Sequence, residues 1–365
     1  MVSINDFNKV FFIGIAGTGM SALAQYLAGI GKKVSGSDRY FLPGQKNDTK
    51  DKLEAEGIHC FLQNGDGITP DTDLVVVSTA VEDTVPEVQK AKSLSIPIIK
   101  RSELLALIAD SKRSIAVGGT SGKSTTSAML FQIMEAAGMN PGIISGAGLV
   151  SIIKEGKIGN AKVGRNDSEW LVIEADESDG SIVQYKPEVG LLLNIDKDHQ
   201  EIEELVAIFH TFKKNTKGTF IVNMSNPLAR ELSQDPSHDF SIDTTSIAGY
   251  IAVDFIQEGL SIRFSVLNPL VPGEKVSFHL QTIGRHNMEN ALAAIAVANQ
   301  SGVPLEVCSA ALSGYEGIYR RHQLLGIKNG IYVIDDYAHN PAKCAASINA
   351  CQQIGSKVVA WFQPH

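Results

Sequence analysis

The 365-residue chain has few cysteines and no long apolar segment. Its four cysteines are too few and too widely spaced for a disulfide scaffold, and none forms a C-x-x-C pair: Cys60, Cys308, Cys344 and Cys351. We expect reduced thiols, with Cys344 and Cys351 as small core residues of one helix. No run approaches the roughly 18 apolar residues of a membrane span, and the first ten residues lack the pattern of an export signal. We therefore expect a soluble, cytoplasmic protein without membrane insertion.

The chain also lacks an excess of positive charge. Forty acidic residues against 32 basic ones give a formal charge of −8, and the two signs are interspersed along the sequence. Such a surface does not attract a polyanion over a broad face, so we expect no nucleic-acid partner. If the ligand is a nucleotide, its phosphates must be held locally by backbone amides, a few basic side chains and a metal ion.

The order of predicted elements divides the chain into three α/β segments. In residues 1–112 short apolar strands alternate with helices, which predicts a Rossmann-like domain with a parallel sheet. Its elements are Val10–Ile13, Met20–Gly29, Lys33–Ser37, Leu74–Ser78 and Ile96–Lys100. Residues 113–324 begin again with a strand, a Gly/Ser/Thr loop and a helix, as in an ATPase-type α/β domain built on a phosphate loop.

The second segment contains further strands and helices. The predicted strands are Ile115–Val117, Trp170–Glu174, Val189–Ile195 and Phe220–Asn223, and the predicted helices are Thr125–Ala137, Glu201–Lys213, Asn287–Ser301 and Leu305–Leu312. Between Phe240 and Gln281 the alternating pattern predicts antiparallel strands at one edge. Residues 325–365 predict a third Rossmann-like start with strand Ile331–Asp335, helix Pro341–Ile354 and strand Lys357–Phe362. Two strands and a helix bury too little to fold alone, so we expect this segment either to pack on the middle domain or to be the start of an incomplete domain.

The glycine-rich loop between strand and helix of the second segment carries the strongest functional signal. It reads Gly118-Gly-Thr-Ser-Gly-Lys-Ser-Thr-Thr126, with Val117 where the general phosphate-loop pattern has its first glycine. Backbone N–H groups at such a helix start bind a triphosphate, the lysine reaches the outer phosphates, and the next hydroxyl binds Mg²⁺. We predict ATP binding by Gly119, Thr120, Ser121, Gly122, Lys123, Ser124 and Thr125; the alternative is a simple glycine-rich turn.

Acidic residues follow two strands of the same segment. Glu174 ends an apolar strand and opens the run Glu-Ala-Asp-Glu-Ser-Asp, where carboxylates face the phosphate loop across the end of an open sheet. Oxygen ligands there suit Mg²⁺, although a solvated acidic loop would give the same pattern. A second strand ends in Asn194-Ile-Asp-Lys-Asp-His199, and beside these features we predict His199 as a ligand of a second magnesium ion.

A second glycine loop, Gly14-Ile-Ala-Gly-Thr-Gly19, follows the first strand of the chain, and Asp38 ends the next strand. Its spacing is G-x-x-G-x-G, and it places a pyrophosphate at a helix N-terminus. The pyrophosphate belongs either to a nicotinamide cofactor or to a diphosphate-linked substrate such as a UDP-sugar, and only the second accounts for both loops. We assign to the UDP-sugar Gly14, Ala16, Gly17, Thr18, Gly19, Met20, Ser37, Asp38 and Ser78.

Seven motifs, in this order, resemble those of the Mur ligases. They are GIAGTGMS from Gly14, GTSGKST from Gly119, EADESD from Glu174, NIDKDH from Asn194, GRHNMEN from Gly284, YRRH from Tyr319 and DDYAHNP from Asp335. Within the family the likeness is strongest to the alanine-adding ligases and next to the ligases that reattach murein tripeptide. The resemblance implies a UDP-sugar domain, a central ATPase domain and a C-terminal domain for the amino acid. It also implies ATP-dependent amide formation on UDP-N-acetylmuramate in peptidoglycan synthesis.

The resemblance also implies roles for single residues. Lys123, Glu174 and His199 would serve catalysis, with Ser124, Glu174 and His199 as magnesium ligands. His286, Asn287 and Asn290 would face the adenine, while Arg320 or Arg321 and Asp335 or Asp336 would bind ribose and phosphate. Asn287 could instead cap its helix, and the arginine pair could lie in a solvated hinge. No side-chain nucleophile is expected, because the carboxylate is activated by phosphoryl transfer.

Three positions differ from the alanine-adding pattern: Ser121 stands where histidine is general, His322 where phenylalanine is usual, and Asn340 where a second histidine occurs. Because the third segment is short, we expect the 365-residue chain to bind UDP-sugar and nucleotide but to ligate poorly or not at all. The alternatives are a nicotinamide-dependent dehydrogenase, a non-catalytic nucleotide-binding module and a folate-type polyglutamate ligase. The amino acid or short peptide that is added and the oligomeric state stay open.

Overall fold

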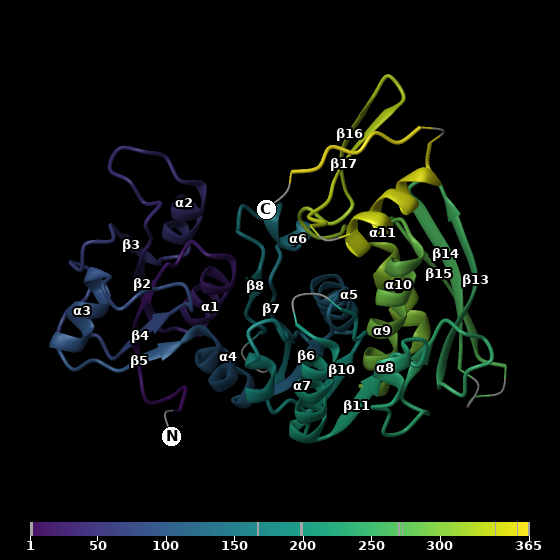
Figure 1. Ribbon diagram of the computed structural model, residues 1–365, viewed down its shortest axis with the longest axis horizontal. Coiled ribbons are helices and arrows are strands. Elements are labelled where there is room, and N and C mark those ends of the chain that lie inside the picture. The colour runs from purple at the N-terminus through teal and green to yellow at the C-terminus, as the bar shows by residue number, and fades with distance from the viewer. Residues whose placement is uncertain are drawn as a thin grey trace. The chain divides into compact units, whose positions relative to one another are not determined.

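The computed structural model describes residues 3–165, 168–197, 200–268, 271, 273–339, 341–355 and 357–363, with the backbone alone at residue 342. The described chain forms two compact units (Figure 1). Unit 1 comprises residues 1–114 and 142–173, and unit 2 comprises residues 115–141 and 174–365. The division into three domains at residues 112 and 324 stays a prediction.

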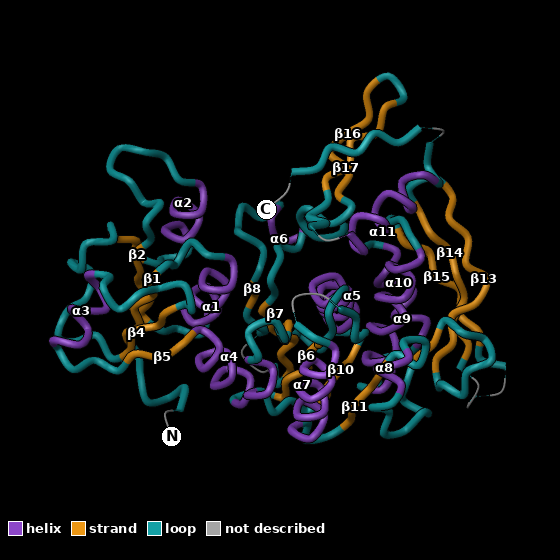
Figure 2. Tube along the Cα trace, in the orientation of Figure 1, coloured by secondary structure: helices purple, strands orange, loops and turns teal. Residues whose placement is uncertain are grey.

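Unit 1 contains a five-stranded parallel sheet of the order β3-β2-β1-β4-β5 (Figure 2). The strands are β1 (Lys9–Ile13), β2 (Lys33–Ser37), β3 (His59–Phe61), β4 (Leu74–Val77) and β5 (Ile98–Lys100), and the helices are α1 (Thr18–Gly29), α2 (Asp48–Ala55), α3 (Pro86–Ser93) and α4 (Arg101–Asp110). Near-continuous apolar residues make β1 and β4 the buried centre of the sheet, as in α/β proteins with both faces covered. The predicted parallel sheet is confirmed.

Unit 1 also includes a segment from later in the chain, residues 142–173. This segment contains β7 (Gly142–Ile144), α6 (Val150–Ile153), β8 (Ala161–Lys162) and most of β9 (Trp170–Glu174). Strand β7 pairs parallel with β9 and antiparallel with β8. The buried amide of Asn160 anchors the segment to α1, because its Nδ2 donates to Thr18 O and Ser21 Oγ and its Oδ1 accepts from Gln25.

In unit 2 three parallel strands, in the order β11-β10-β6, carry the phosphate loop. The elements are β6 (Arg113–Gly118), α5 (Lys123–Ala136), the short 3₁₀ turn η1 (Ser181–Gln184), β10 (Val189–Leu192), α7 (Ile202–Asn215), β11 (Thr219–Val222) and α8 (Pro227–Arg230). Helix α7 buries Leu205, Phe209 and Phe212 on one face, at the three- and four-residue spacing of an amphipathic helix. These strands end at one edge, where the functional loops begin.

The predicted antiparallel strands form a four-stranded sheet of their own, with the order β12-β13-β14-β15. They are β12 (Phe240–Ser241), β13 (Tyr250–Glu258), β14 (Ser261–Leu267) and β15 (Lys275–Leu280), and the last three are antiparallel. A single parallel bridge between Asn223 and Phe240 connects this sheet to the end of β11. Helices α9 (Arg285–Gln300) and α10 (Leu305–Ser313) follow, and α9 contacts both α5 and β13.

The C-terminal segment differs from the prediction. Strand β17 (Ile331–Asp335) and helix α11 (Pro341–Gln352) form as expected, but β17 pairs antiparallel with β16 (Gln323–Lys328), which the sequence analysis missed. The predicted strand Lys357–Phe362 is wrong: its described residues adopt no strand, and Trp361 is 98% exposed. A strand is stable only when its backbone N–H and C=O groups form hydrogen bonds with a neighbouring strand. Within the described residues, β17 pairs with β16.

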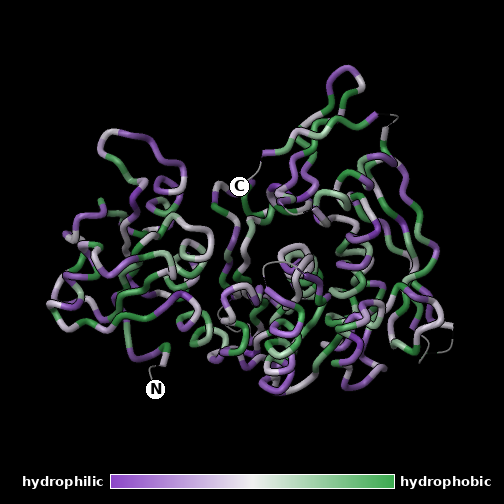
Figure 3. Tube along the Cα trace, in the orientation of Figure 1, coloured by the Kyte–Doolittle hydropathy of each residue, from purple (hydrophilic) through white to green (hydrophobic). Residues whose placement is uncertain are grey.

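Hydrophobic and hydrophilic residues mix along the whole trace (Figure 3). Among the described residues, no helix is both long and apolar enough to cross a bilayer.

Candidate functional site

The phosphate loop connects β6 to α5 at the edge of unit 2 where the parallel strands end. Two of its glycines have positive φ, +135° at Gly119 and +88° at Gly122, the residue that caps α5. A side chain at Gly122 would also overlap the Asn290 amide, and one at Gly119 would lie against Leu193. Glycine is therefore required at both positions, and the backbone N–H groups at the start of α5 point out of the helix end, an arrangement that suits an anion.

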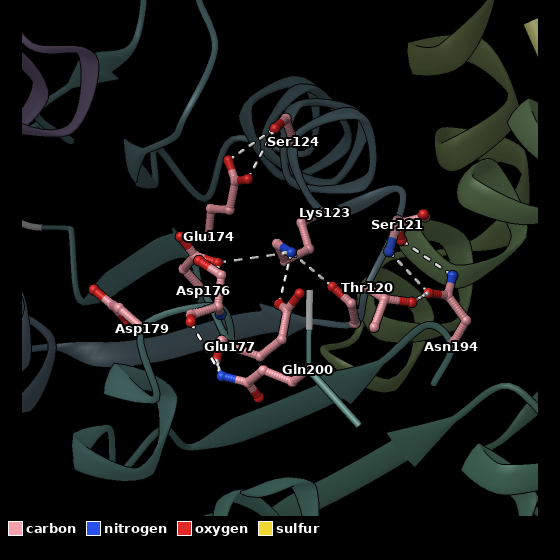
Figure 4. Close-up of polar contacts among 12 residues, drawn as sticks. Thr120, Ser121, Lys123, Ser124, Glu174, Asp176, Glu177, Asp179, Asn194 and Gln200 are labelled. Carbon is pink, nitrogen blue, oxygen red and sulfur yellow. Dashed lines mark hydrogen bonds and ion pairs between the residues drawn. The ribbon is translucent and has the colours of Figure 1, made fainter. Parts of the chain in front are cut away.

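Lys123 lies in a cluster of carboxylates (Figure 4). Its Nζ donates to Gly119 O at 2.7 Å and to Glu177 Oε2 at 2.7 Å, and Asp176 Oδ1 is 4.0 Å away. Burial lowers the pKa of the Lys123 ammonium, but Glu177, Glu174 and Asp176 outweigh this effect, so its pKa lies above the usual range. The lysine is held charged at the place where outer phosphates would bind.

Ser124 and Glu174 face each other beside the lysine. The Ser124 hydroxyl lies 2.9 Å from both carboxylate oxygens of Glu174. Glu174 reaches the loop because the chain after β9 stays next to β6, with Ala175 N–H donating to Val117 O at 2.9 Å. A hydroxyl and a carboxylate are ligands that Mg²⁺ uses when phosphates and water complete its shell, so this pair fits that ion. His199 lies outside the described residues.

Asn194, directly after β10, holds the phosphate loop in shape. Its Oδ1 accepts from Thr120 Oγ1 at 2.8 Å and from Ser121 N–H at 2.9 Å, and its Nδ2 donates to Ser121 O at 3.1 Å. Asp196 N–H also donates to the Thr120 hydroxyl. The sequence analysis noted the motif that Asn194 opens but did not include it among the site residues. Its place after a buried strand of the same sheet was the available signal.

These groups line a cavity of about 400 Å³ together with the N-terminus of α9. His286, Asn287 and Asn290 lie in this lining, as do Lys123, Ser124 and Glu174. Asn290 Nδ2 donates to Asn287 Oδ1 at 3.3 Å, and Asn287 Nδ2 donates to Thr282 Oγ1 and Ile283 O. Asn287 does not cap its helix, since Gly284 holds that position.

Two histidine rings lie at another part of the cavity wall. The centroids of His286 and His322 are 5.0 Å apart. Burial lowers the pKa of His286 to about 4, helped by His322 and opposed by Asp336. The Asp336 carboxylate accepts the backbone N–H of His322 at 2.8 Å and lies 3.3 Å from its Nδ1. Both rings are neutral at pH 7, because burial also lowers the pKa of His322.

The structure separates the two arginines and the two aspartates that the motifs leave open. Arg321 and Asp336 line the cavity, whereas Arg320 pairs with Asp335 at 3.2 Å. Arg320 has a positive φ of +57° and His322 one of +45°, so the backbone of this turn is left-handed on both sides of Arg321. The cavity lining also includes residues that the sequence analysis did not predict: Asp176, Glu177, Glu289, Tyr315, His339 and Lys343.

The glycine loop of unit 1 lies between β1 and α1. Gly14 has a φ of +81°, and Gly14 and Ile15 donate to Ser37 O at the end of β2. Asp38 is 4% exposed, and its carboxylate accepts the N–H groups of Ala16 at 2.9 Å and Tyr40 at 3.0 Å. Asp38 therefore fixes the loop itself. The remaining predicted residues lie in this loop, in the first turn of α1 or at strand ends: Gly17, Thr18, Gly19, Met20, Ser37 and Ser78.

Comparison with known proteins identifies the family of the chain. Residues 9–113 match the Mur ligase family, catalytic domain, and residues 117–298 match the Mur ligase middle domain. The UDP-N-acetylmuramate–L-alanine ligase from Pelotomaculum thermopropionicum is 36% identical to the chain, and the one from Bdellovibrio bacteriovorus is 37% identical. Both alignments cover 98% of this chain, and they cover 76% and 78% of the two relatives, respectively. The crystal structure of UDP-N-acetylmuramate-alanine ligase from Thermotoga maritima superposes with a TM-score of 0.81 at 26% identity, over 96% of this chain and 78% of that one. A murein peptide ligase from Psychrobacter arcticus gives a TM-score of 0.78 at 25% identity, over 95% of this chain and 76% of that one. Two consecutive family domains match, and relatives 36% and 37% identical cover 98% of the chain. The chain therefore belongs to the Mur ligase family.

Proposed function

We propose that the chain is an ATP-dependent ligase that joins L-alanine to the carboxylate of UDP-N-acetylmuramate, a step of peptidoglycan synthesis in the cytoplasm. The observation that carries the proposal is the charged Lys123 at the phosphate loop, with the Ser124 and Glu174 pair beside it in the lining of one cavity. The glycine loop of unit 1, fixed by Asp38, gives a second place for a diphosphate.

The reaction follows from the weak electrophilicity of a carboxylate. In the first step a carboxylate oxygen of the muramoyl group attacks the γ-phosphorus of ATP, and the bond to the bridging oxygen breaks to release ADP. In the second step the alanine amine attacks the carbonyl carbon of the acyl phosphate, phosphate leaves with the bonding electron pair, and the amine loses a proton. Positioning and charge stabilisation dominate such phosphoryl transfers, so no side-chain nucleophile is required.

The described residues supply three parts of this chemistry. Lys123 neutralises the charge on the transferred phosphoryl group, and the N–H groups of Gly122 and the start of α5 orient the phosphates. Ser124 and Glu174 would hold magnesium, which supplies a Lewis acid that shields the negative charge of the outer phosphates. Asn287 and Asn290, with His286, form the wall for the nucleoside.

Isothermal titration tests the substrate class. UDP-N-acetylmuramic acid and UDP-N-acetylglucosamine are titrated separately into the protein, with the magnesium complex of a non-hydrolysable ATP analogue present. The proposal expects selective binding of the muramic acid form. Equal binding of both sugars, or binding of neither while the nucleotide still binds, would refute the muramate substrate and leave an ATP-binding protein of another specificity.

A second candidate is attachment of a peptide in place of L-alanine, because a murein peptide ligase superposes nearly as well as the alanine ligase. Phosphate release in the presence of ATP, Mg²⁺ and UDP-N-acetylmuramate separates the two. L-alanine alone and the tripeptide L-alanyl-γ-D-glutamyl-meso-diaminopimelate are offered as amines. The proposal expects any stimulation of phosphate release to come from alanine, and stimulation by the tripeptide alone would replace it with the peptide ligase.

A further inference from the structure

Glu177 has no role in the proposed chemistry, yet it makes a short charged contact in the cavity lining. Its carboxylate is 6% exposed and lies 2.7 Å from Lys123 Nζ, which is itself 13% exposed. Burial raises the pKa of the Glu177 carboxyl and Lys123 opposes that rise, so the two groups depend on each other for their charge. A buried carboxylate and ammonium at this distance form a tight ion pair.

The loop that carries Glu177 is also held in place. Gln200 Nε2 donates to the carbonyl oxygens of Glu177 and Ser178, at 3.4 and 3.1 Å. Ser178 N–H donates to Asp176 Oδ1 at 3.1 Å, which closes a tight turn at this point. The Glu177 side chain is therefore presented to Lys123 by a fixed backbone.

The charge balance of the cavity gives this pair its significance. The described lining contains three basic side chains, Lys123, Arg321 and Lys343, against five acidic ones, Glu174, Asp176, Glu177, Glu289 and Asp336. The formal charge is negative in a cavity that has to accept a polyanion. The Glu177 carboxylate offsets the charge of the Lys123 ammonium, so the outer phosphates of free ATP would enter a cavity of net negative charge, where like charges repel.

We propose that Glu177 makes nucleotide binding depend on the divalent metal, by neutralising Lys123 and excluding the metal-free nucleotide. The proposal rests on the ATP site of the proposed function. When the metal-bound nucleotide enters, its lower charge removes the repulsion, and Lys123 has a third N–H with which to reach a phosphate while it keeps Gly119 and Glu177. Glu177 is thus a residue that selects the form of the substrate through Lys123.

The test compares two affinities in two variants. Glu177→Gln keeps an oxygen that can accept from Lys123 but removes the negative charge. The matched control is Asp179→Asn, which removes the same charge from the same loop, from an exposed side chain that accepts from Ser181 N–H. Titration calorimetry measures ATP with EDTA, and the non-hydrolysable analogue with Mg²⁺, for the wild type and both variants.

In Glu177→Gln we expect metal-free ATP to bind about tenfold more tightly than in the wild type, because one negative charge beside Lys123 is removed. The magnesium complex should keep its affinity within about twofold, and Asp179→Asn should match the wild type in both conditions. Unchanged or weaker binding of metal-free ATP by Glu177→Gln overturns the proposal, as does an equal effect of Asp179→Asn.

A second measurement uses the wild type alone, and it decides the proposal if Glu177→Gln does not fold. AMP, ADP and ATP are titrated with EDTA and with Mg²⁺. Affinity should rise with each added phosphate in Mg²⁺ but not in EDTA, and an equally steep rise in EDTA overturns the proposal. A wild type that binds no nucleotide in either condition refutes the ATP site itself, which separates failure of the proposed function from failure of this inference.

Discussion

Replacement of Asn194 by alanine tests whether a side chain outside the phosphate loop organises it. The amide of Asn194 makes three hydrogen bonds to the loop, two to Ser121 and one to Thr120, at 2.8 to 3.1 Å. A hydrogen bond between neutral groups contributes about 0.5–1.5 kcal/mol net, so the three together contribute about 1.5–4.5 kcal/mol to loop order. In Asn194→Ala the nucleotide must order the loop itself on binding.

If about half of that free energy is drawn from binding, the dissociation constant of the magnesium complex of an ATP analogue rises roughly three- to fortyfold. Titration calorimetry measures the change. Asn140→Ala is the control, because Asn140 is another asparagine whose Nδ2 bonds only locally, to Gly138 O at 2.8 Å, among the contacts described. Asn194→Asp keeps both acceptor contacts and loses the donor, so it should fall between wild type and alanine unless its charge repels the phosphates. Wild-type affinity in Asn194→Ala would refute the reasoning.

Three further predictions concern the loop glycine and two buried titratable groups. Gly122→Ala places a side chain at a φ of +88° against Asn290, so thermal unfolding should show a loss of about 2 kcal/mol and nucleotide titration a loss of binding; stability equal to the wild type would contradict the strain. Burial raises the pKa of Asp239 to about 6. As the pH rises from 4 to 6, the unfolded chain loses this proton while the folded state keeps it, so the free energy of unfolding falls by up to about 3 kcal/mol. Asp239→Asn can still accept from Val222 N–H and donate to Ser233 Oγ, and urea unfolding across this range should show a flatter slope than the wild type. Burial lowers the pKa of His286 to about 4, so the unfolded chain binds a proton first and stability falls as the pH drops from about 7 to 4. In the same urea series, His286→Asn should lose about 3 kcal/mol less stability than the wild type between pH 7 and 4. An equal loss of stability in both proteins over this range would contradict the prediction.

The sequence by itself was enough to predict most of the helices and strands and the positions of the two glycine loops. The strand of β9 was predicted at its observed bounds, and the two glycine loops were placed correctly between a strand and a helix, because apolar runs and glycines act over a few residues. Lys123, Ser124 and Glu174 were placed together for a related reason: parallel strands end at one edge of a sheet, so motifs that follow strands share that edge.

Only the tertiary structure decided which of these side chains meet. No local pattern shows that Asn194 bonds to Ser121 or that Glu177, three residues after Glu174, is the partner of Lys123. The structure also separated Arg320, paired with Asp335, from Arg321 at the cavity. The predicted strand Lys357–Phe362 did not form, while β16 did. Strand formation depends on a partner that local sequence does not encode, and the pairing of distant charges depends on how sheets and helices pack.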